Sequence, residues 1–280
     1  MREVNAKQIK EKVKELFLEA NYCIGEDVLN SIKEASFKET SETGKNVLSM
    51  ILQNYKVSAE EKIAICQDTG LAILFIKLGQ EVHINGNWEE AINEGVKEAY
   101  IEGYLRKSAV TDPVFDRKNT KTNCPAIIYT DIVPGDKIEF LVTPKGFGSE
   151  NMSRLAMMKP ADGPEGIVDF IVETVKIAGP NPCPPTIVGV CVGGTTDQAS
   201  VTAKKATLRK VGEHNLDPRY ADMEKQALEK INNLGIGPAG LGGNTTSLWV
   251  NIDYKPTHIA GMPVAVNICC HAARHASGII

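Results

Sequence analysis

Two short, continuous apolar runs constrain the fold more than any other feature of this sequence. Residues 71–77 read LAILFIK and residues 186–192 read TIVGVCV, and glycines lie beside both runs. Apolar runs of this length without alternation are typical of strands that are buried on both faces of a sheet. Such strands need covering layers, so the sequence predicts an α/β fold in which helices cover a mixed β-sheet core.

Helical periodicity dominates the N-terminal part of the chain. Asn5 and Gln8 form a cap pair ahead of the first amphipathic stretch. Ser58 and Glu61 form a capping-box signature, which predicts the start of a short helix that runs into Cys66. The N-terminal part is therefore expected to be a layer of helices.

Turn and cap signals organise the rest. Residues 134–136, Pro-Gly-Asp, separate the runs AIIYTDIV and KIEFLVT and predict a β-hairpin. Asn87 and Glu90 cap a further helix, and the helix that Asp217 opens is expected to stop at Gly235. The runs SLWVNID and PVAVNI are expected to be the last strands.

No internal repeat, low-complexity tract or change of composition marks a linker. We therefore expect residues 1–280 to form a single domain, with residues 1–60 as a helical layer within it.

Charge and composition exclude several function classes. The formal net charge of -4 argues against a nucleic-acid-binding protein, which would need a basic face. The longest apolar runs are far shorter than the roughly 20 residues that cross a bilayer, and the N-terminus lacks the apolar core of a signal peptide. Seven cysteines without an export signal favour free or metal-bound thiols in a reducing cytoplasm.

The cysteines lack short ligand spacing. No C-x₂-C pair occurs, and burial as a small apolar side chain is the commonest fate of a free cysteine. Cys66, Cys183 and Cys270 differ from the rest because they lie at the ends of predicted elements, where functional groups are usually presented. Spacing alone does not show that these three meet. The other four fit core or strand positions: Cys23, Cys124, Cys191 and Cys269.

Several polar residues suit the chemistry of an anionic substrate. Arg106 follows an amphipathic helix, where a guanidinium either clamps a carboxylate or remains a solvated helix-end cation. Residues 145–151, KGFGSEN, form a glycine loop leading into a helix, which suits an oxyanion site or a simple turn. His258 lies in a loop before a strand, and Asp68 is a turn carboxylate beside Cys66.

One tempting motif lacks its context. Residues 235–240 match the dinucleotide fingerprint G-x-G-x-x-G. A helix rather than a strand leads into these glycines, whereas the fingerprint needs a strand before them and a helix after them. A loop that ends a helix is the better interpretation.

Taken in order, seven segments between residues 66 and 274 resemble the class I, iron–sulfur fumarate hydratases and the related L-tartrate dehydratases. Their order and spacing agree with the pattern of that family over most of the chain. The segments are CQDTG, YLRKSAV, KGFGSEN, KPADG, NPCPPTIVGVCVGGT, GLGGN and KPTHIAGMPVAVNICCHAAR.

The resemblance implies a 4Fe–4S cluster and a set of site residues. The family's cluster ligands fall on Cys66, Cys183 and Cys270. Three thiolates leave one iron without a protein ligand, and such an iron can act as a Lewis acid. Asp68 is implied as a candidate for proton transfer. The positions that line the substrate site in the family fall on Gln67, Asp68, Arg106, Gly148 and His258.

The activity implied is the reversible hydration of fumarate, a small dicarboxylate, to (S)-malate. Full-length family members carry a second, C-terminal domain, so the resemblance points to an alpha subunit that needs a separate beta subunit in a hetero-oligomer. The GFGSEN loop favours fumarate over the alternative, an L-tartrate dehydratase alpha subunit. A non-catalytic iron–sulfur sensor or electron carrier, and a structural subunit with buried thiols, stay open as alternatives from other classes.

Overall fold

A computed structural model describes residues 1–280 and confirms the mixed α/β fold. It divides into two compact units, each built from separate stretches of the chain. Unit 1 consists of Met1–Ile24, Asn54–Phe147 and Arg274–Ile280, and unit 2 of Gly25–Gln53 and Gly148–Ala273. A single domain over the whole chain stays a prediction.

Unit 1 contains a four-stranded mixed sheet in the order β10-β5-β2-β4 and a small parallel pair, β1 with β3. The first apolar run forms the inner strand β2. The elements of unit 1 are β1 (Arg2–Asn5), α1 (Ala6–Tyr22), β2 (Leu71–Gly79), β3 (Val82–Asn85), α4 (Trp88–Glu102), β4 (Ile127–Val133), β5 (Ile138–Lys145) and β10 (Ala276–Ile279).

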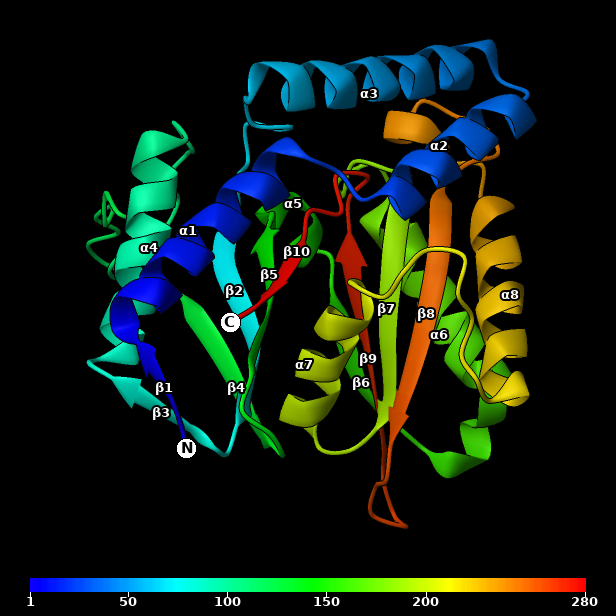
Figure 1. The fold of residues 1–280 in the computed structure, drawn as a ribbon. Helices are drawn as coiled ribbons and strands as arrows, with labels where there is room; N and C mark the ends of the chain where they lie inside the picture. Colours follow the sequence, from blue (N-terminus) through cyan, green and yellow to red (C-terminus); the bar gives the residue numbers. More distant parts are fainter. The chain divides into compact units, whose positions relative to one another are not determined.

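Helices α1 and α4 pack on one face of this sheet (Figure 1). Asn5 caps α1 and makes the expected capping box with Gln8. The buried faces of the two helices, with Phe17 and Tyr100 as their largest side chains, contact the even-numbered positions of β2 and β5. Burying each large side chain of this kind contributes about 1.5–3 kcal/mol, which explains why the amphipathic stretches predicted their buried faces well.

Two local predictions are wrong. β4 and β5 are strands, but they form no hairpin, because β2 lies between them and pairs with both. A strand buried on both faces takes an inner position, and this non-local pairing outweighs the turn signal at residues 134–136.

No helix starts at Ser58, which lies inside α3 (Glu42–Glu61) and donates its hydroxyl to the carbonyls of Tyr22 and Ile63. The chain passes from unit 2 into unit 1 within α3.

Unit 2 contains the second mixed sheet, in the order β6-β9-β7-β8. The second apolar run forms β7, which is buried along its whole length. The elements of unit 2 are α2 (Glu26–Lys38), β6 (Arg154–Met158), α6 (Gly163–Ala178), β7 (Thr186–Gly193), α7 (Thr196–Ala206), α8 (Pro218–Asn232), β8 (Ser247–Lys255) and β9 (Met262–Cys269), with one turn of helix, α5 (Phe147–Glu150), at its start and 3₁₀ turns at Pro160–Asp162 and Pro238–Gly240.

Helices cover both faces of this sheet (Figure 1). Helices α6 and α8 pack on the face that carries Val188, Val190 and their neighbours on β8 and β9. Helix α7 packs on the opposite face, against Cys191 and Ala265. Asp217 caps α8 as expected, but the helix ends at Asn232, three residues before Gly235.

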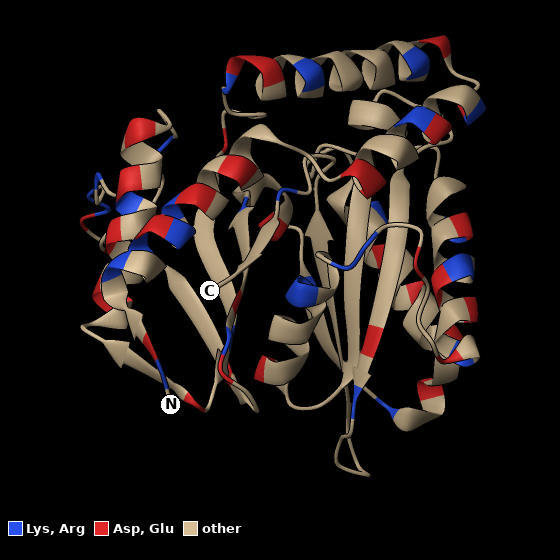
Figure 2. Ribbon diagram, in the orientation of Figure 1, with Lys and Arg blue, Asp and Glu red and all other residues tan.

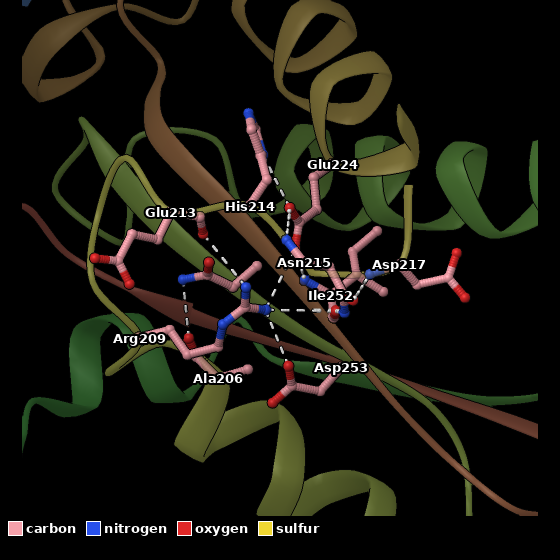
Figure 3. A network of polar contacts seen from close by, with 10 residues as sticks. Ala206, Arg209, Glu213, His214, Asn215, Asp217, Glu224, Ile252 and Asp253 are labelled. Carbon is pink, nitrogen blue, oxygen red and sulfur yellow. Dashed lines mark hydrogen bonds and ion pairs between the residues drawn. The ribbon is translucent and has the colours of Figure 1, made fainter. Parts of the chain in front are cut away.

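A buried carboxylate fastens the segment between α7 and α8 to the sheet (Figure 3). Glu224 of α8 accepts hydrogen bonds from the backbone N–H groups of Ile252 at 2.8 Å and Asn215 at 3.0 Å. Its two oxygens also accept from Arg209 at 3.3 Å and contact Nδ1 of His214 at 2.9 Å. A buried carboxylate is stable only with such partners, and here each oxygen has two. We call these residues the Glu224 network.

Charged residues gather on helices and loops, and the strands are mostly uncharged (Figure 2). This distribution matches strands that lie inside and helices that expose one face. No helix is both long enough and apolar enough to span a membrane.

Candidate active site

The segment Cys66–Gly70 joins α3 to β2, and its shape is fixed by hydrogen bonds from three other parts of unit 1. The buried hydroxyl of Tyr100 donates to the carbonyls of Thr69 at 2.6 Å and Gly70 at 3.1 Å. Burial raises the pKa of this hydroxyl, with Arg274 opposing and Asp68 adding to the shift. Tyr100 therefore stays a neutral donor at physiological pH.

Asp68 is held by two backbone donors. Its Oδ1 accepts from the N–H of Gly70 at 3.0 Å, and its Oδ2 accepts from the N–H of Phe147 at 2.8 Å. Phe147 directly precedes Gly148, so the carboxylate contacts the KGFGSEN loop. The segment contains only one helical turn, α5, so of the two alternatives the structure fits a simple turn rather than the N-terminus of a long helix.

Arg106 lies beside the same segment. The hydroxyl of Thr69 donates to the carbonyl of Arg106 at 2.9 Å. The Arg106 side chain is exposed, as is that of Gln67, while Asp68 is half-buried. Unit 1 thus brings three of the predicted site residues together.

Arg274 ends one of the family motifs, but it was not among the predicted site residues. It is 2 % exposed, and its Nη1 lies 3.4 Å from Oδ1 of Asn21 while its Nε has no hydrogen-bond partner. A Cβ on Gly146 would lie 3.2 Å from Oδ2 of Asp68 and 3.4 Å from Nη2 of Arg274, so the glycine lets both groups approach its backbone. A buried guanidinium with an unused donor is typical of a site that binds an anion.

In unit 2 the structure brings together two of the three predicted cluster ligands, although 86 residues separate them in sequence. The N–H of His271 donates to the carbonyl of Cys183 at 3.3 Å. The antiparallel register, in which Ile187 of β7 lies opposite Cys269 of β9, explains this placement. Cys183 precedes β7 and Cys270 follows β9, so both lie at the same end of the sheet.

The backbone at Cys183 has a left-handed conformation, with φ of 53°. A non-glycine residue in this region carries strain that is often found at functional sites. Cys183 is exposed, and Cys66 and Cys270 are half-buried. None of the seven cysteines forms a disulfide.

Of the four cysteines expected at core or strand positions, Cys124 is half-buried and Cys23 is exposed, so the expectation is wrong for Cys23. Cys191 and Cys269 are buried in β7 and β9. Burial raises the pKa of the Cys191 thiol to about 11. A thiol with so high a pKa is a poor metal ligand, because metals bind the thiolate.

The Gly148 loop is fastened near the end of β9 that Cys270 follows. Glu150 contacts Nζ of Lys204 at 2.6 Å and accepts from Nδ2 of Asn267 at 3.0 Å. The N–H of Ile268 donates to the hydroxyl of Ser153 at 3.3 Å. Gly148 itself is exposed.

His258 is not brought to this end of the sheet. It is exposed in the loop between β8 and β9, beyond the C-terminal end of β8. Because β8 runs parallel to β7, this loop lies at the opposite end of the sheet from Cys183. β7 has eight residues, so the two ends are about 25 Å apart at about 3.3 Å per residue. Neither unit by itself contains a group of three His, Cys, Asp or Glu side chains that could hold one metal ion.

Comparison with known proteins agrees with these features. Residues 10–279 match the family model described as fumarate hydratase (Fumerase). The chain belongs to the fumarate hydratase family. It is thus a member of a family of hydro-lyases, and the resemblance read from the sequence motifs is confirmed.

Relatives within the family carry a more specific name. The chain is 46 % identical over 276 residues to a putative L(+)-tartrate dehydratase subunit alpha from Methanocaldococcus jannaschii, covering 96 % of both chains. It is 33 % identical to the L(+)-tartrate dehydratase subunit alpha of Escherichia coli O157:H7, over all of this chain and 94 % of the relative. The protein of the same name from strain K12 is 31 % identical with the same coverage.

Proposed function

We propose that this chain is the alpha subunit of an iron–sulfur hydro-lyase that dehydrates L-tartrate and is completed by a separate beta subunit. The observation that carries the proposal is the backbone bond between His271 and Cys183, in a member of the fumarate hydratase family, because it joins the two segments that contain the predicted ligands Cys183 and Cys270. The names of the relatives support tartrate as the substrate and an alpha–beta assembly. This revises the preference for fumarate that the GFGSEN loop suggested.

The donor set suits an iron–sulfur cluster. Cys66, Cys183 and Cys270 would supply three thiolates from positions at element ends that the core does not enclose. A 4Fe–4S cluster held in this way would supply a Lewis-acidic iron for a substrate hydroxyl. The proposal requires Cys66 to reach coordination distance of the other two cysteines, which makes it open to a spectroscopic test.

The residues of the chain itself would bind and orient the substrate. Arg106 and Gln67 are exposed next to Asp68 and would bind one carboxylate of a dicarboxylic acid, with Gly148 offering a backbone N–H from its loop. Asp68, oriented by its two backbone donors, would accept the proton from the carbon next to the one that loses hydroxide. The proton and the hydroxide leave as water, so the dehydration needs no oxidant.

The position of His258 in unit 2 sets it apart from the other predicted site residues of that unit. Within unit 2 it lies at the opposite end of the sheet from Cys183 and Cys270, so its contribution is the part of the predicted site that most needs a test. Activity of the His258→Asn variant, compared with that of Arg106→Gln, tests whether it contributes to the site at all.

Fumarate is the second candidate substrate, since the matching family model carries that name. Dehydration of (S)-malate to fumarate and dehydration of L-tartrate break the same kinds of bond, one C–O and one C–H, in a four-carbon dicarboxylate. Anaerobic co-production with a beta subunit, followed by rates on L-tartrate and on (S)-malate, decides between them. The proposal predicts the higher kcat/KM on L-tartrate, and a higher value on malate would reverse the choice.

Cysteine variants test the cluster assignment. Cys66→Ala, Cys183→Ala and Cys270→Ala are each expected to abolish turnover and the cluster's visible absorbance after anaerobic reconstitution, because the iron–sulfur centre loses a ligand. Cys191→Ala is the matched control and should keep both, since its thiol is buried in β7. Turnover retained by any of the first three variants would remove that residue from the ligand set. Turnover by the isolated, reconstituted chain would contradict the need for a beta subunit.

A further inference from the structure

The loop between α4 and β4 exposes three large apolar side chains within a short stretch of sequence. Tyr104 is 94 % exposed, Phe115 is 87 % exposed and Val114 is 68 % exposed. Single exposed apolar residues are ordinary, but three within 12 residues, on a loop of fixed shape, indicate a contact surface. We call residues 104–121 the docking loop.

Hydrogen bonds fix the shape of the docking loop. The N–H of Thr111 donates to the carbonyl of Lys118 at 2.8 Å, and the N–H of Thr120 donates to that of Ala109 at 2.9 Å. At the tip, Asp112 accepts from the backbone N–H groups of Val114 and Phe115. The backbone of the tip is therefore ordered before a partner binds, which lowers the entropy lost on binding and favours tight association.

The backbone is also strained within the docking loop and at Asn123, two residues after it. Tyr104, Arg117, Lys121 and Asn123 have φ values of 52°, 46°, 60° and 62°. These are four of the seven non-glycine residues with positive φ in the chain. Such a concentration persists only where the surrounding contacts enforce it, and it is a property of binding and catalytic segments.

The base of the docking loop is bonded to the segment that carries Asp68. Buried Asn123 accepts from the N–H groups of Ser108 at 2.8 Å and Ala109 at 3.1 Å, and donates to the carbonyl of Gly70 at 3.1 Å. Thr69 donates to the carbonyl of Arg106, which belongs to the loop. A partner that holds the tip would therefore also hold Arg106 and the candidate site segment.

The charge of the docking loop differs from that of the whole chain. It carries five cations and two carboxylates, a net charge of +3, in a chain of net charge -4. The cations are Arg106, Lys107, Arg117, Lys118 and Lys121, and the carboxylates are Asp112 and Asp116. A complementary surface has an apolar pocket with an acidic rim.

We propose that the docking loop binds an apolar, acid-rimmed pocket on the beta subunit and so joins that subunit to the candidate site. The inference rests on the proposed function, which requires a second subunit. A small dicarboxylate would not cover Phe115, because it has no apolar surface to offer. The docking loop and its base are hydrogen-bonded to Thr69 and Gly70, next to Asp68. This explains why a subunit that completes the site would bind this loop.

Binding of the anaerobically reconstituted chain to a purified beta subunit, measured by calorimetry, tests the inference. Phe115→Ala is expected to raise the Kd by about 30-fold, the effect of losing a central interface aromatic. Phe115→Leu, which keeps an apolar side chain, should stay within about 5-fold of the original Kd. Melting temperature and cluster absorbance should not change in either variant.

Phe37→Ala is the matched control, since Phe37 is 88 % exposed on α2 in unit 2. It should bind the beta subunit with the original affinity. If Phe115→Ala binds with the original affinity while the wild-type chain and the beta subunit together are active, the inference about the docking loop is overturned and the proposed function stands. A wild-type chain that neither binds the beta subunit nor gains activity from it would overturn both. A homodimer that Phe115→Ala dissociates would show that the loop binds a second copy instead.

Discussion

The two carboxylates Glu224 and Asp68 show how differently polar groups are used in the two units. Each oxygen of Glu224 has two partners, and its side chain is completely buried. Asp68 is half-buried with one backbone donor to each oxygen, and nearby Arg274 has a buried Nε without a partner. A buried polar group stabilises the fold when all of its hydrogen-bonding positions are filled. A polar group that keeps an unused donor or acceptor can instead bind a ligand. The comparison indicates that the Glu224 network serves the fold, and it supports the chemical role that we propose for the Asp68 region.

The largest expected effect separates activity from stability at Asp68. Asp68→Asn keeps the shape of the side chain but removes the proton acceptor, so we expect kcat of the assembled, reconstituted enzyme to fall by about 10³-fold. The free energy of unfolding should change by less than about 1 kcal/mol, because the amide oxygen still accepts a backbone hydrogen bond. Initial rates and urea unfolding measure the two quantities. A large loss of stability with activity unchanged would reverse the roles assigned to the two carboxylates.

The opposite pattern is expected at Glu224. Glu224→Gln removes the fully buried one of the two carboxylates that pair with Arg209 and turns an amide N–H toward other donors, so we expect a loss of about 3 kcal/mol in the free energy of unfolding. Within unit 2 the network lies away from the candidate site residues. At a temperature where the variant is folded, its kcat should therefore stay within about 3-fold of the original value. That ratio corresponds to a change of less than about 1 kcal/mol in the activation free energy. Glu165→Gln, on the first turn of α6, is a surface control.

The smallest effect concerns Asp253, which pairs with Arg209 at the edge of the network. Burial raises the pKa of this carboxyl, and Arg209 only partly offsets the shift. A raised carboxyl pKa means that protonation favours the folded state, a contribution that is present below the unfolded pKa and lost as the pH rises through the folded pKa.

Asp253→Asn should therefore be more favourable to stability at pH 7 than at pH 4. The difference is expected to be a few tenths of a kcal/mol, since water screens a carboxylate that is about one third exposed. Urea unfolding at the two pH values measures it, with exposed Asp116→Asn as the control. A variant that loses stability on going from pH 4 to pH 7, relative to the original chain, would show that the ion pair outweighs burial.

Local signals in the sequence predicted most helices and strands well, but they predicted poorly which strands pair with one another. The capping box at Asn5, the helix at Asn87 and the strand at residues 71–79 are present because each depends on neighbouring residues. The hairpin at residues 134–136 is absent because strand order depends on which strand buries both faces, a property of the whole sheet.

The candidate site shows the same difference between what local patterns predict and what depends on the whole fold. Periodicity and spacing left every cysteine a plausible core residue, and only the ordered motifs selected Cys66, Cys183 and Cys270. Arg274 and Asn123 were assigned no role from the sequence, because their contacts arise from burial between segments far apart in the chain. The far placement of His258 follows from the parallel pairing of β7 with β8, which no local pattern contains.

The bond between His271 and Cys183 also bears on the order of assembly. Strand β9 lies between β6 and β7, and β10 completes the edge of the unit 1 sheet beside β5. During synthesis, neither sheet can close until residues 262–279 have been added, and contacts this distant in sequence form slowly. A nascent chain that stops before β9 carries Cys66 and Cys183 without the strand that sets Cys270 beside Cys183. Loading of a metal centre at these cysteines would therefore follow translation of nearly the whole chain.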